Sequence, residues 1–340
     1  MTACLAASHR TLLEGFRAAA RDFAEAPVRS ALSSLFAPSA EVRLGHPFSA
    51  MVGADAYYTQ ALAPLFAALP DLERRDDILI AGADGDGADW VGAGGHYVGT
   101  FVAPWLGIPP TGRPVALRYH EFWRFEDGRV VEGQGIWDLP DLMLQAAVWP
   151  MAPPLGRTWR VPGPATQDGV RQGARDAQRS DASAARVVAM LTALQRYPSE
   201  GGPEVMEMDR FWHPRMAWYG PGGIGSGLGV AGFRAMHQTP FLRAFPDRGL
   251  HRDGIRHHFF GDGPYVGVTG WPNMKQTLTG SGWLGLPATG AEVTLRSLDF
   301  WRLDGDRIRE NWVLVDLMDA WAQVGVDVLA RMRELTGAWR

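Results

Sequence analysis

The chain lacks the features that mark secreted, membrane-spanning or nucleic-acid-binding proteins. Its 340 residues include one cysteine, Cys4, so no disulfide can form within the chain, as is usual in a reducing compartment. No apolar run approaches the ~18 residues that a membrane-spanning helix needs, and residues 1–10 hold no signal-peptide pattern. The net charge is −4 without any basic run, which gives nucleic acid no electrostatic support as a partner. We therefore expect a cytoplasmic protein that binds neither membranes nor nucleic acid.

The chain is instead rich in aromatic residues and repeats itself once. Its 14 Trp and 15 Phe can fill a large core or line deep pockets. One set of matching residues recurs after 176 positions and a second set after 178, which is too regular for chance. The first set pairs Phe36, Pro38, Gly53, Pro64, Pro70 and Asp71 with Trp212, Pro214, Gly229, Pro240, Pro246 and Asp247. The second pairs Trp105, Gly107, Thr111, Trp123, Glu132 and Asp138 with Trp283, Gly285, Thr289, Trp301, Glu310 and Asp316.

A proline-rich segment separates the two copies. It contains Pro153, Pro154, Pro162 and Pro164, followed by a polar stretch. Proline at this density excludes a regular helix or a central strand, so the segment is predicted to be an extended linker. The sequence thus predicts domain 1 over residues 1–150, a linker over 151–179 and domain 2 over 180–340.

Each copy is predicted to begin with helices and to end with strands. Apolar residues at helical spacing predict helices over 5–25, 30–36 and 57–69 in the first copy, and over 182–196, 204–212 and 233–245 in the second. Strand patterns follow over 78–82, 90–101, 113–126 and 129–138, with a hairpin turn at Asp127 and Gly128. This order predicts an α+β fold in which a curved antiparallel sheet wraps over helices, and the concave face of such a sheet is a natural pocket.

Several segments resemble the SnoaL-like polyketide cyclase and ester cyclase pattern of the NTF2-like superfamily. In the first copy these are residues 107–113 and 122–129 with Trp137 and Asp138, and in the second residues 299–302, 304–308 and 310–312 with Asp316. The resemblance implies two tandem cone-shaped domains, each with a pocket in which Asp, Glu or His acts as acid and base without a metal or organic cofactor. Such domains usually pair through their sheets, which implies an intramolecular pseudo-dimer and leaves a further homodimer open.

The two copies differ where the resemblance places chemistry. His96, His120, Tyr57 and Gln134 of the first copy align with Trp271, Leu298, Phe233 and Trp312 of the second. Histidine suits proton transfer because its ordinary pKa lies near neutrality, so domain 1 is predicted to be the active half. The predicted catalytic residues are His120, Asp138, His96 and Glu121. The predicted substrate-binding residues are His46, Tyr57, Trp105, Gln134 and Trp137.

Structural interpretations of the same residues stay open. A histidine on a strand is often a structural residue, and Glu121 and Asp299 align, which is compatible with a shared structural bond. Asp138 and Asp316 are equally suited to cap the helices that follow them. The second copy has its own histidines, which leave a separate site possible: His213, His237, His251, His257 and His258.

No metal site or nucleotide site is expected. His257 and His258 are adjacent, and adjacent residues of a strand point to opposite faces, so the pair cannot readily share one ion. The glycine-rich stretch 220–229 lacks the Gly-Lys-Ser/Thr ending of a phosphate-binding loop and is interpreted as a flexible lip.

The predicted function is general acid–base catalysis without a cofactor on a small or medium organic substrate. Cyclase, isomerase and lyase reactions share one demand, which is removal of a proton next to a carbonyl and stabilisation of the enolate. The alternatives are a hydrolase in which a carboxylate activates water, and a protein that binds a small molecule without turning it over.

Overall fold

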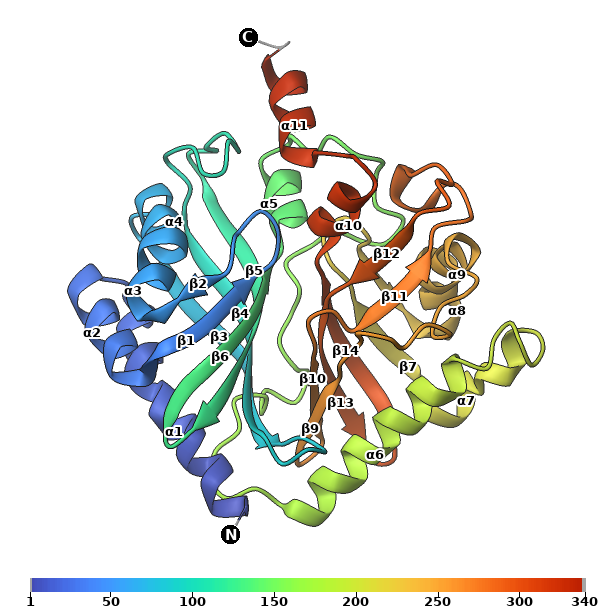
Figure 1. Cartoon of the computed structure of the whole chain (residues 1–340), viewed down its shortest axis with the longest axis horizontal. Coiled ribbons are helices and arrows are strands. Elements are labelled where there is room, and N and C mark those ends of the chain that lie inside the picture. Colours follow the sequence, from blue (N-terminus) through green and yellow to red (C-terminus); the bar gives the residue numbers. More distant parts are fainter. Residues whose placement is uncertain (1, 338–340) are drawn as a thin grey trace. The chain divides into compact units, whose positions relative to one another are not determined.

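The computed structural model describes residues 2–337, with side chains from His9 onward, and divides into two compact units (Figure 1). The first, called domain 1, comprises Met1–Pro150, Pro162–Arg175 and Asp327–Arg340; the second, domain 2, comprises Met151–Val161 and Asp176–Val326. The proline-rich segment therefore contributes to both units, through bridges that pair Arg157 with Ser226 and Val170 with Leu79. Sequence patterns gave no sign that the C-terminal residues belong to the first unit.

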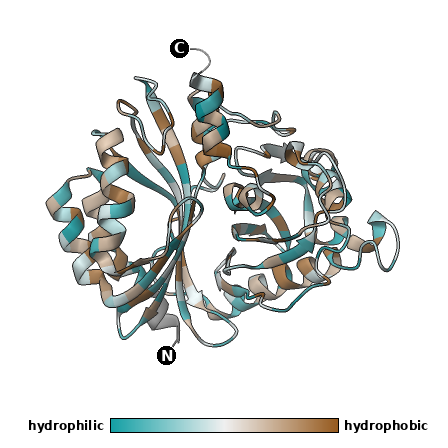
Figure 2. Ribbon diagram, turned by 45° about the horizontal axis from the view of Figure 1, so that its top comes forward, coloured by the Kyte–Doolittle hydropathy of each residue, from teal (hydrophilic) through white to brown (hydrophobic). Residues whose placement is uncertain are grey.

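The described part of domain 1 contains six α-helices. They are α1 (Thr2–Arg21), α2 (Glu25–Leu35), α3 (Gly53–Tyr57), α4 (Ala63–Ala68), α5 (Leu139–Gln145) and the C-terminal α11 (Val328–Gly337), with a π-helical turn at Tyr58–Leu62 between α3 and α4. Leu13, Phe16 and Ala20 of α1 are buried, as the apolar stripe predicted. Figure 2 shows hydrophobic and hydrophilic stretches alternating along these helices, as expected for helices with one buried face.

The domain 1 sheet has six strands in the order β2-β1-β6-β5-β4-β3. Their bounds are β1 (Phe36–Leu44), β2 (Met51–Val52), β3 (Glu73–Ala83), β4 (Asp89–Thr100), β5 (Pro114–Glu126) and β6 (Arg129–Trp137). All neighbours are antiparallel except β1 and β6. Asp127 and Gly128 join β5 to β6 with φ of 48° and 74°, the left-handed conformations that a tight hairpin needs, so the predicted turn is confirmed.

Domain 2 repeats this order. Its helices are α6 (Ala177–Leu194), α7 (Met208–Phe211), α8 (Gly229–Phe233), α9 (Thr239–Ala244) and α10 (Leu317–Gln323), with 3₁₀ turns at Pro203–Met206 and Trp283–Gly285 and a π-helical turn at Arg234–Gln238. The sheet order β8-β7-β14-β13-β10-β9 matches that of domain 1 strand for strand. The strands are β7 (Trp212–Tyr219), β8 (Ser226–Leu228), β9 (His258–Asp262), β10 (Tyr265–Thr269), β13 (Ser297–Asp304) and β14 (Arg307–Val315). The structure thus confirms two tandem α+β domains.

The strands of domain 2 are shorter and broken. The counterpart of β4 is split into β10 and β11 (Met274–Thr277), with Pro272, which has no N–H to donate, in the gap. The counterpart of β5 is split into β12 (Glu292–Leu295) and β13, and β11 pairs with β12 as a separate ribbon. Strand β9 has 5 residues where β3 has 11, so residues 249–257 form a loop where domain 1 has a strand. Because of these breaks, the domain 2 sheet is less continuous than the domain 1 sheet.

Candidate active site in domain 2

In domain 1 the concave face of the sheet carries a buried carboxylate that is bonded on all sides. Glu121 on β5 is fully buried. Its Oε1 accepts hydrogen bonds from the Tyr97 hydroxyl at 3.1 Å and the Trp137 indole N–H at 2.9 Å, with the Tyr57 hydroxyl at 3.5 Å. Its Oε2 accepts from the Arg74 guanidinium at 2.6 Å. The protein itself therefore occupies the acceptor positions of this carboxylate.

The same network continues to the edge of the domain. Arg74 also donates to the Asp76 carboxylate at 3.0 Å, and the Tyr119 hydroxyl donates to Asp76 as well. Arg17 of α1 bonds the second oxygen of Asp76 at 2.6 Å. Charges are paired and hydrogen-bonded throughout, which is what a buried ionic network requires to be tolerated.

The structure brings together some of the residues predicted for a domain 1 site. Tyr57, Glu121 and Trp137 form the network just described, and the Trp105 ring lies 6.0 Å from the Trp137 ring. His46 lies in the segment between β1 and β2 and is half-buried. Tyr57, Trp105, Glu121 and Trp137 thus form one cluster of aromatic rings around a carboxylate.

His120, His96 and Gln134 lie on the other face of the sheet. His120 is the strand neighbour of Glu121, and neighbouring strand residues point to opposite faces. Strand pairing places Gln134 opposite Phe122 and His96 opposite Arg118, which are on the His120 face. The Nδ1 atom of His96 lies 3.1 Å from the Asp77 carboxylate.

Asp138 acts as a helix cap. Its Oδ1 accepts a hydrogen bond from the Asp141 backbone N–H at 3.2 Å at the start of α5, and its Oδ2 lies 3.2 Å from Arg118. Asp316 caps α10 in the same way, through the Asp319 N–H. The capping interpretation of this repeated aspartate is confirmed in both domains.

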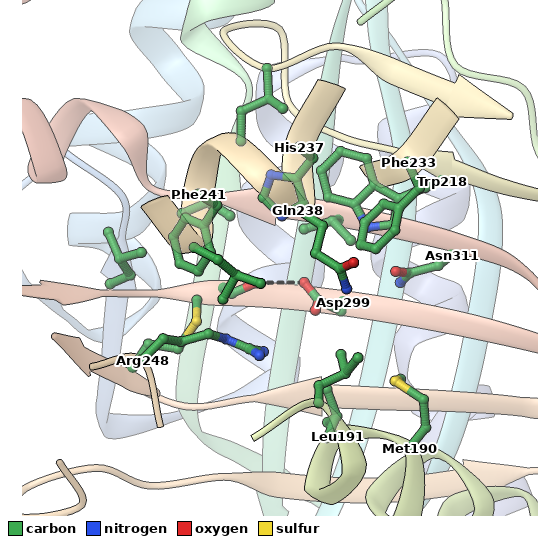
Figure 3. Close-up of a pocket in the computed structure, with 18 of the residues that line it drawn as sticks. Met190, Leu191, Trp218, Phe233, His237, Gln238, Phe241, Arg248, Asp299 and Asn311 are labelled. Atoms are coloured by element: carbon green, nitrogen blue, oxygen red, sulfur yellow. Dashed lines mark hydrogen bonds between the residues drawn. The ribbon is translucent and has the colours of Figure 1, made fainter. Parts of the chain in front are cut away.

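A cavity opens on the concave face of domain 2 (Figure 3). It has about 740 Å³ of empty volume, part of it open to solvent, and a mostly aromatic and aliphatic lining. Its aromatic walls are Trp212, Trp218, Phe233, Phe241, Trp283 and Trp301. The polar lining residues are His237, Gln238, Arg248, Ser297, Asp299 and Asn311. An apolar cavity with a few convergent polar groups is the usual form of a small-molecule site.

Asp299 is the acidic residue of this lining. It occupies the position of Glu121, because Asp299 pairs with Val268 and Val313 as Glu121 pairs with Ala93 and Gly135. The Ser297 hydroxyl donates to its Oδ1 at 2.6 Å. Burial raises the pKa of Asp299 to about 7, against the opposing effects of the Ser297 hydrogen bond and the Arg248 charge. The carboxyl group is thus poised between its protonated and charged forms near neutral pH.

Asp299 has this pKa because domain 2 lacks the partners of Glu121. At the positions of Tyr57, Tyr97 and Trp137 domain 2 has Phe233, Pro272 and Val315, none of which can donate a hydrogen bond from its side chain. The place of Arg74 on β3 falls in the loop 249–257. A carboxylate that loses its donors while staying enclosed is destabilised in its charged form, which raises its pKa.

His237 is held between aromatic rings above Asp299. Its ring stacks on Trp218 at 4.3 Å and on Phe241 at 5.5 Å. Burial, with a smaller contribution from Arg248, lowers its pKa to about 3, so the imidazole is neutral at physiological pH. Its Nδ1 atom is buried and has no hydrogen-bond partner among the described residues. His237 therefore offers a neutral, fixed ring to a ligand in the cavity.

Arg248 brings a positive charge to the cavity. It lies in the segment after α9, and its guanidinium extends into the space beside Leu191 (Figure 3). Burial lowers its pKa, and the nearby Asp299 charge opposes that effect. Within residues 2–337 no ion pair is found for it. Its counterpart in the repeat is Leu72, which is buried in domain 1.

Sequence reasoning found part of this site. His237 was recognised as a possible separate site and Asp299 as the counterpart of Glu121, whereas Arg248 and Ser297 were missed. A usable signal existed for Arg248, since a charge replaces a leucine in an otherwise matching stretch. Ser297 replaces Tyr119, a smaller change whose meaning depends on the pairing of the strands.

Metal ligands do not gather in the part of the chain that the structure describes. No group of three or more His, Cys, Asp or Glu side chains there is placed to hold an ion. Among the described helices none is long and apolar enough to cross a membrane.

Comparison with known proteins identifies the two halves with one family. The family model described as SnoaL-like polyketide cyclase matches residues 15–146 and 190–324, which is more than half of the chain. No curated protein matches the chain.

Solved structures match one domain at a time. AclR from Streptomyces galilaeus is 21% identical over 43% of this chain and 85% of its own, with a TM-score of 0.36. IdmH from Streptomyces antibioticus is 22% identical over 41% and 97%, with a TM-score of 0.34. An NTF2-like protein from Burkholderia thailandensis is 22% identical over 41% and 96%, with a TM-score of 0.32.

Proposed function

Because the chain belongs to the SnoaL-like polyketide cyclase family, we propose that it is a cofactor-independent acid–base enzyme of the cyclase or isomerase type and that domain 2 carries the chemistry. The substrate is an organic molecule with an aromatic or polycyclic body, which suits the aromatic walls of the cavity. The reaction begins with removal of a proton from a carbon next to a carbonyl. The observation that carries the proposal is Asp299, a carboxyl group in an apolar cavity with a pKa of about 7.

Asp299 is suited to be the general base. A base works best when its pKa lies near the working pH, because it is then both deprotonated and strong enough to take a proton. Ser297 holds Oδ1, and among the described residues no hydrogen bond reaches Oδ2. Oδ2 is therefore the atom that takes the substrate proton.

The cavity also holds groups that stabilise the resulting enolate. Arg248 places a positive charge near Asp299, and a charge in an enclosed site acts more strongly than in water. The indole N–H groups of Trp212 and Trp301 are buried and lack an acceptor among side chains from His9 onward. One of these donors can bind the enolate oxygen, while the neutral ring of His237 fixes the orientation of the substrate by stacking.

Domain 1 then has a structural role. The proposal departs from the expectation that His120 and Asp138 perform the chemistry, because His120 lies on the sheet face opposite Glu121 and Asp138 caps α5. Glu121 itself is bonded to four side chains and fully buried. A carboxylate in that state has no oxygen to offer to a substrate proton.

Hydrogen–deuterium exchange tests the proposal without knowledge of the natural substrate. Aromatic ketones such as α-tetralone exchange the protons next to the carbonyl slowly, and a general base speeds that exchange. We expect the protein to accelerate exchange in D₂O, measured by ¹H NMR, with a rate that rises as pH increases through about 7, because Asp299 must lose its proton to act. Binding of these ketones without any acceleration would leave only the non-catalytic binding function.

Ser297→Ala sharpens the assignment. The serine hydrogen bond favours the charged form of Asp299, so its removal raises the pKa of Asp299 further. We expect the midpoint of the pH–rate profile to move to higher pH by about one to two units, since a hydrogen bond to a charged group contributes about 1.5–3 kcal/mol and one pKa unit corresponds to about 1.4 kcal/mol. An unchanged midpoint would mean that another group titrates.

A further inference from the structure

A second chamber adjoins the aromatic cavity of domain 2. It has about 1250 Å³ of empty volume, part of it open to solvent, and it lies against α6 and the loop 249–257. The two spaces share six lining residues, namely Leu191, Arg248, Met274, Ser297, Asp299 and Trp301. The two chambers therefore lie around the same side chains, with Asp299 and Arg248 among the residues where they meet.

The lining of this outer chamber is basic. Arg248, Arg252, Lys275, His251 and His257 line it, whereas Asp299 is its single acidic residue. Two of the basic groups are matched by carboxylates from nearby positions. Lys275 lies 3.0 Å from Glu292, and His251 lies 3.0 Å from Asp247. Arg248 and Arg252 form no ion pair with a carboxylate within residues 2–337, although the Asp299 charge acts on Arg248. The two guanidinium groups therefore outnumber the single carboxyl group of the chamber.

The backbone holds these arginines in place. Arg252 donates to the side-chain oxygen of Gln195 at 3.0 Å, at the end of α6. Between the two arginines Gly249 has φ of 83°, and a Cβ there would lie 2.9 Å from the Gln195 side chain. The loop therefore packs tightly against the end of α6, which orients Arg252 before any ligand arrives.

The charges act on neighbouring groups. Burial is the main cause that lowers the pKa of His257, and a hydrogen bond that the ring donates to the Asn273 backbone opposes it. The charges of His258, Arg252 and Arg248 lower this pKa further. Arg248 also lowers the pKa of His237 in the inner cavity. These contributions to the pKa values of His257 and His237 indicate a positive electrostatic potential in both chambers.

Among the described residues of domain 1 this pair of arginines has no equivalent on the matching strand. The corresponding segment is β3, whose Arg74 is paired with Glu121 at 2.6 Å and with Asp76 at 3.0 Å. Its charge is neutralised inside the protein. The two unpaired arginines are thus specific to the domain whose strand has become a loop.

We propose that the outer chamber binds an anionic group of the substrate, a carboxylate or a phosphate, on Arg248 and Arg252, while the aromatic body of the same molecule enters the inner cavity. The inference rests on the proposed function, because it names the substrate class of that site as an anionic aromatic carbonyl compound. Guanidinium groups match carboxylate and phosphate oxygens in geometry as well as charge.

Matched naphthalene probes test this with a binding readout alone. Isothermal titration of 2-naphthoate, 2-naphthyl phosphate and 2-naphthamide compares two anions with a neutral molecule that is isosteric with the first of them. We expect at least one anion to bind about tenfold or more tightly than the amide, because charge-assisted hydrogen bonds are roughly twice as strong as neutral ones. The tighter anion identifies the group. Equal binding of all three probes would overturn the proposal.

Substitutions locate the effect. Arg252→Gln should remove most of the preference for the anion while leaving the amide affinity unchanged. Arg248→Gln should remove most of the preference as well. Arg243→Gln is the matched control, because Arg243 is an exposed arginine of α9 that lines neither chamber. Loss of anion binding in Arg243→Gln as large as in Arg252→Gln would show a long-range charge effect instead and would overturn the assignment. Arg252 is exposed, so its variant is expected to fold.

Asp299→Asn separates this inference from the proposed function. The substitution removes a negative charge next to Arg248, so anion binding should strengthen while proton exchange is lost. Anion preference in a protein without any exchange activity would contradict the proposed function alone. Exchange activity on α-tetralone without anion preference would contradict the outer chamber alone.

Discussion

Glu121 in domain 1 and Asp299 in domain 2 occupy matching positions on matching strands, and nearly every contact around them differs. Four side chains donate hydrogen bonds to Glu121, whereas among the described residues only Ser297 donates to Asp299. In domain 1, Arg74 on the continuous strand β3 neutralises Glu121. In domain 2 the matching part of that strand is a loop, and the nearby positive charge is that of Arg248, which precedes the loop. The comparison shows that the hydrogen-bond and charge partners of a carboxyl group, rather than its position in the fold, determine its pKa and whether an oxygen is available to a ligand.

The largest expected difference between the domains is in catalysis. Asp299→Asn should lower the rate of proton exchange by about 10²–10⁴, the usual cost of losing a general base. The matched change Glu121→Gln should leave the rate within about twofold in protein that stays folded, because Glu121 contacts only protein groups. Exchange rates by NMR, with circular dichroism to confirm folding, test both. A loss confined to Glu121→Gln would return the chemistry to domain 1.

The next difference is in stability. Arg74→Met should lower the free energy of unfolding by about 3–5 kcal/mol, because it leaves the buried carboxylates of Glu121 and Asp76 without their charged partner. Arg248→Met should change it by less than about 1 kcal/mol, since no described carboxylate depends on an ion pair with Arg248. Urea unfolding followed by tryptophan fluorescence measures both. Equal costs for the two arginines would refute the contrast between a closed network and an open site.

A smaller effect is the dependence of stability on pH. The folded state raises the pKa of Asp299 to about 7 from an ordinary 3.8, so the folded protein binds this proton more tightly than the unfolded chain. Its contribution is therefore fully present below about pH 4 and is lost as pH rises to about 7. Asp299→Asn has no charge to bury, so its stability relative to wild type should increase from pH 5 to pH 8 by roughly 2 kcal/mol.

A control on this effect is Glu132→Gln, a half-buried carboxylate of β6 in domain 1 that pairs with Arg124 at the surface. Its stability relative to wild type should not increase over the same pH interval. Parallel behaviour of the two variants would show that the Asp299 effect reflects net charge rather than its enclosure.

The smallest expected effect is one in which the domains behave alike. Asp138→Ala and Asp316→Ala should each lower the free energy of unfolding by about 1 kcal/mol, the usual cost of a lost helix cap, without changing the pH–rate profile. Thermal unfolding and the exchange assay measure the two outcomes. A loss of exchange activity in Asp138→Ala at unchanged stability would restore this residue to catalysis.

The predicted sites in domain 1 show where sequence patterns stop being sufficient. Residues 120 and 121 were both assigned to one pocket, yet strand alternation lets only one of them face it. The pattern on β6 groups Gln134 with Asp138, but Asp138 lies past the end of β6 and caps α5. Nothing in a single sequence tells which face of the sheet is concave. The expected pairing of the two sheets within the chain remains a prediction.

The sequence by itself determined the repeat, the α+β class, the family and the capping aspartates, because these depend on local periodicity and on spacing along the chain. Only the tertiary structure decided that Glu121 accepts hydrogen bonds from four side chains while Asp299, among the described residues, accepts one from Ser297. That difference depends on residues far apart in the sequence. Phe233 of α8, Pro272 between β10 and β11, and Val315 of β14 take the places of the domain 1 residues that donate hydrogen bonds to Glu121. The pKa of a buried group is set by all its neighbours at once, and that sum exists only in the folded chain.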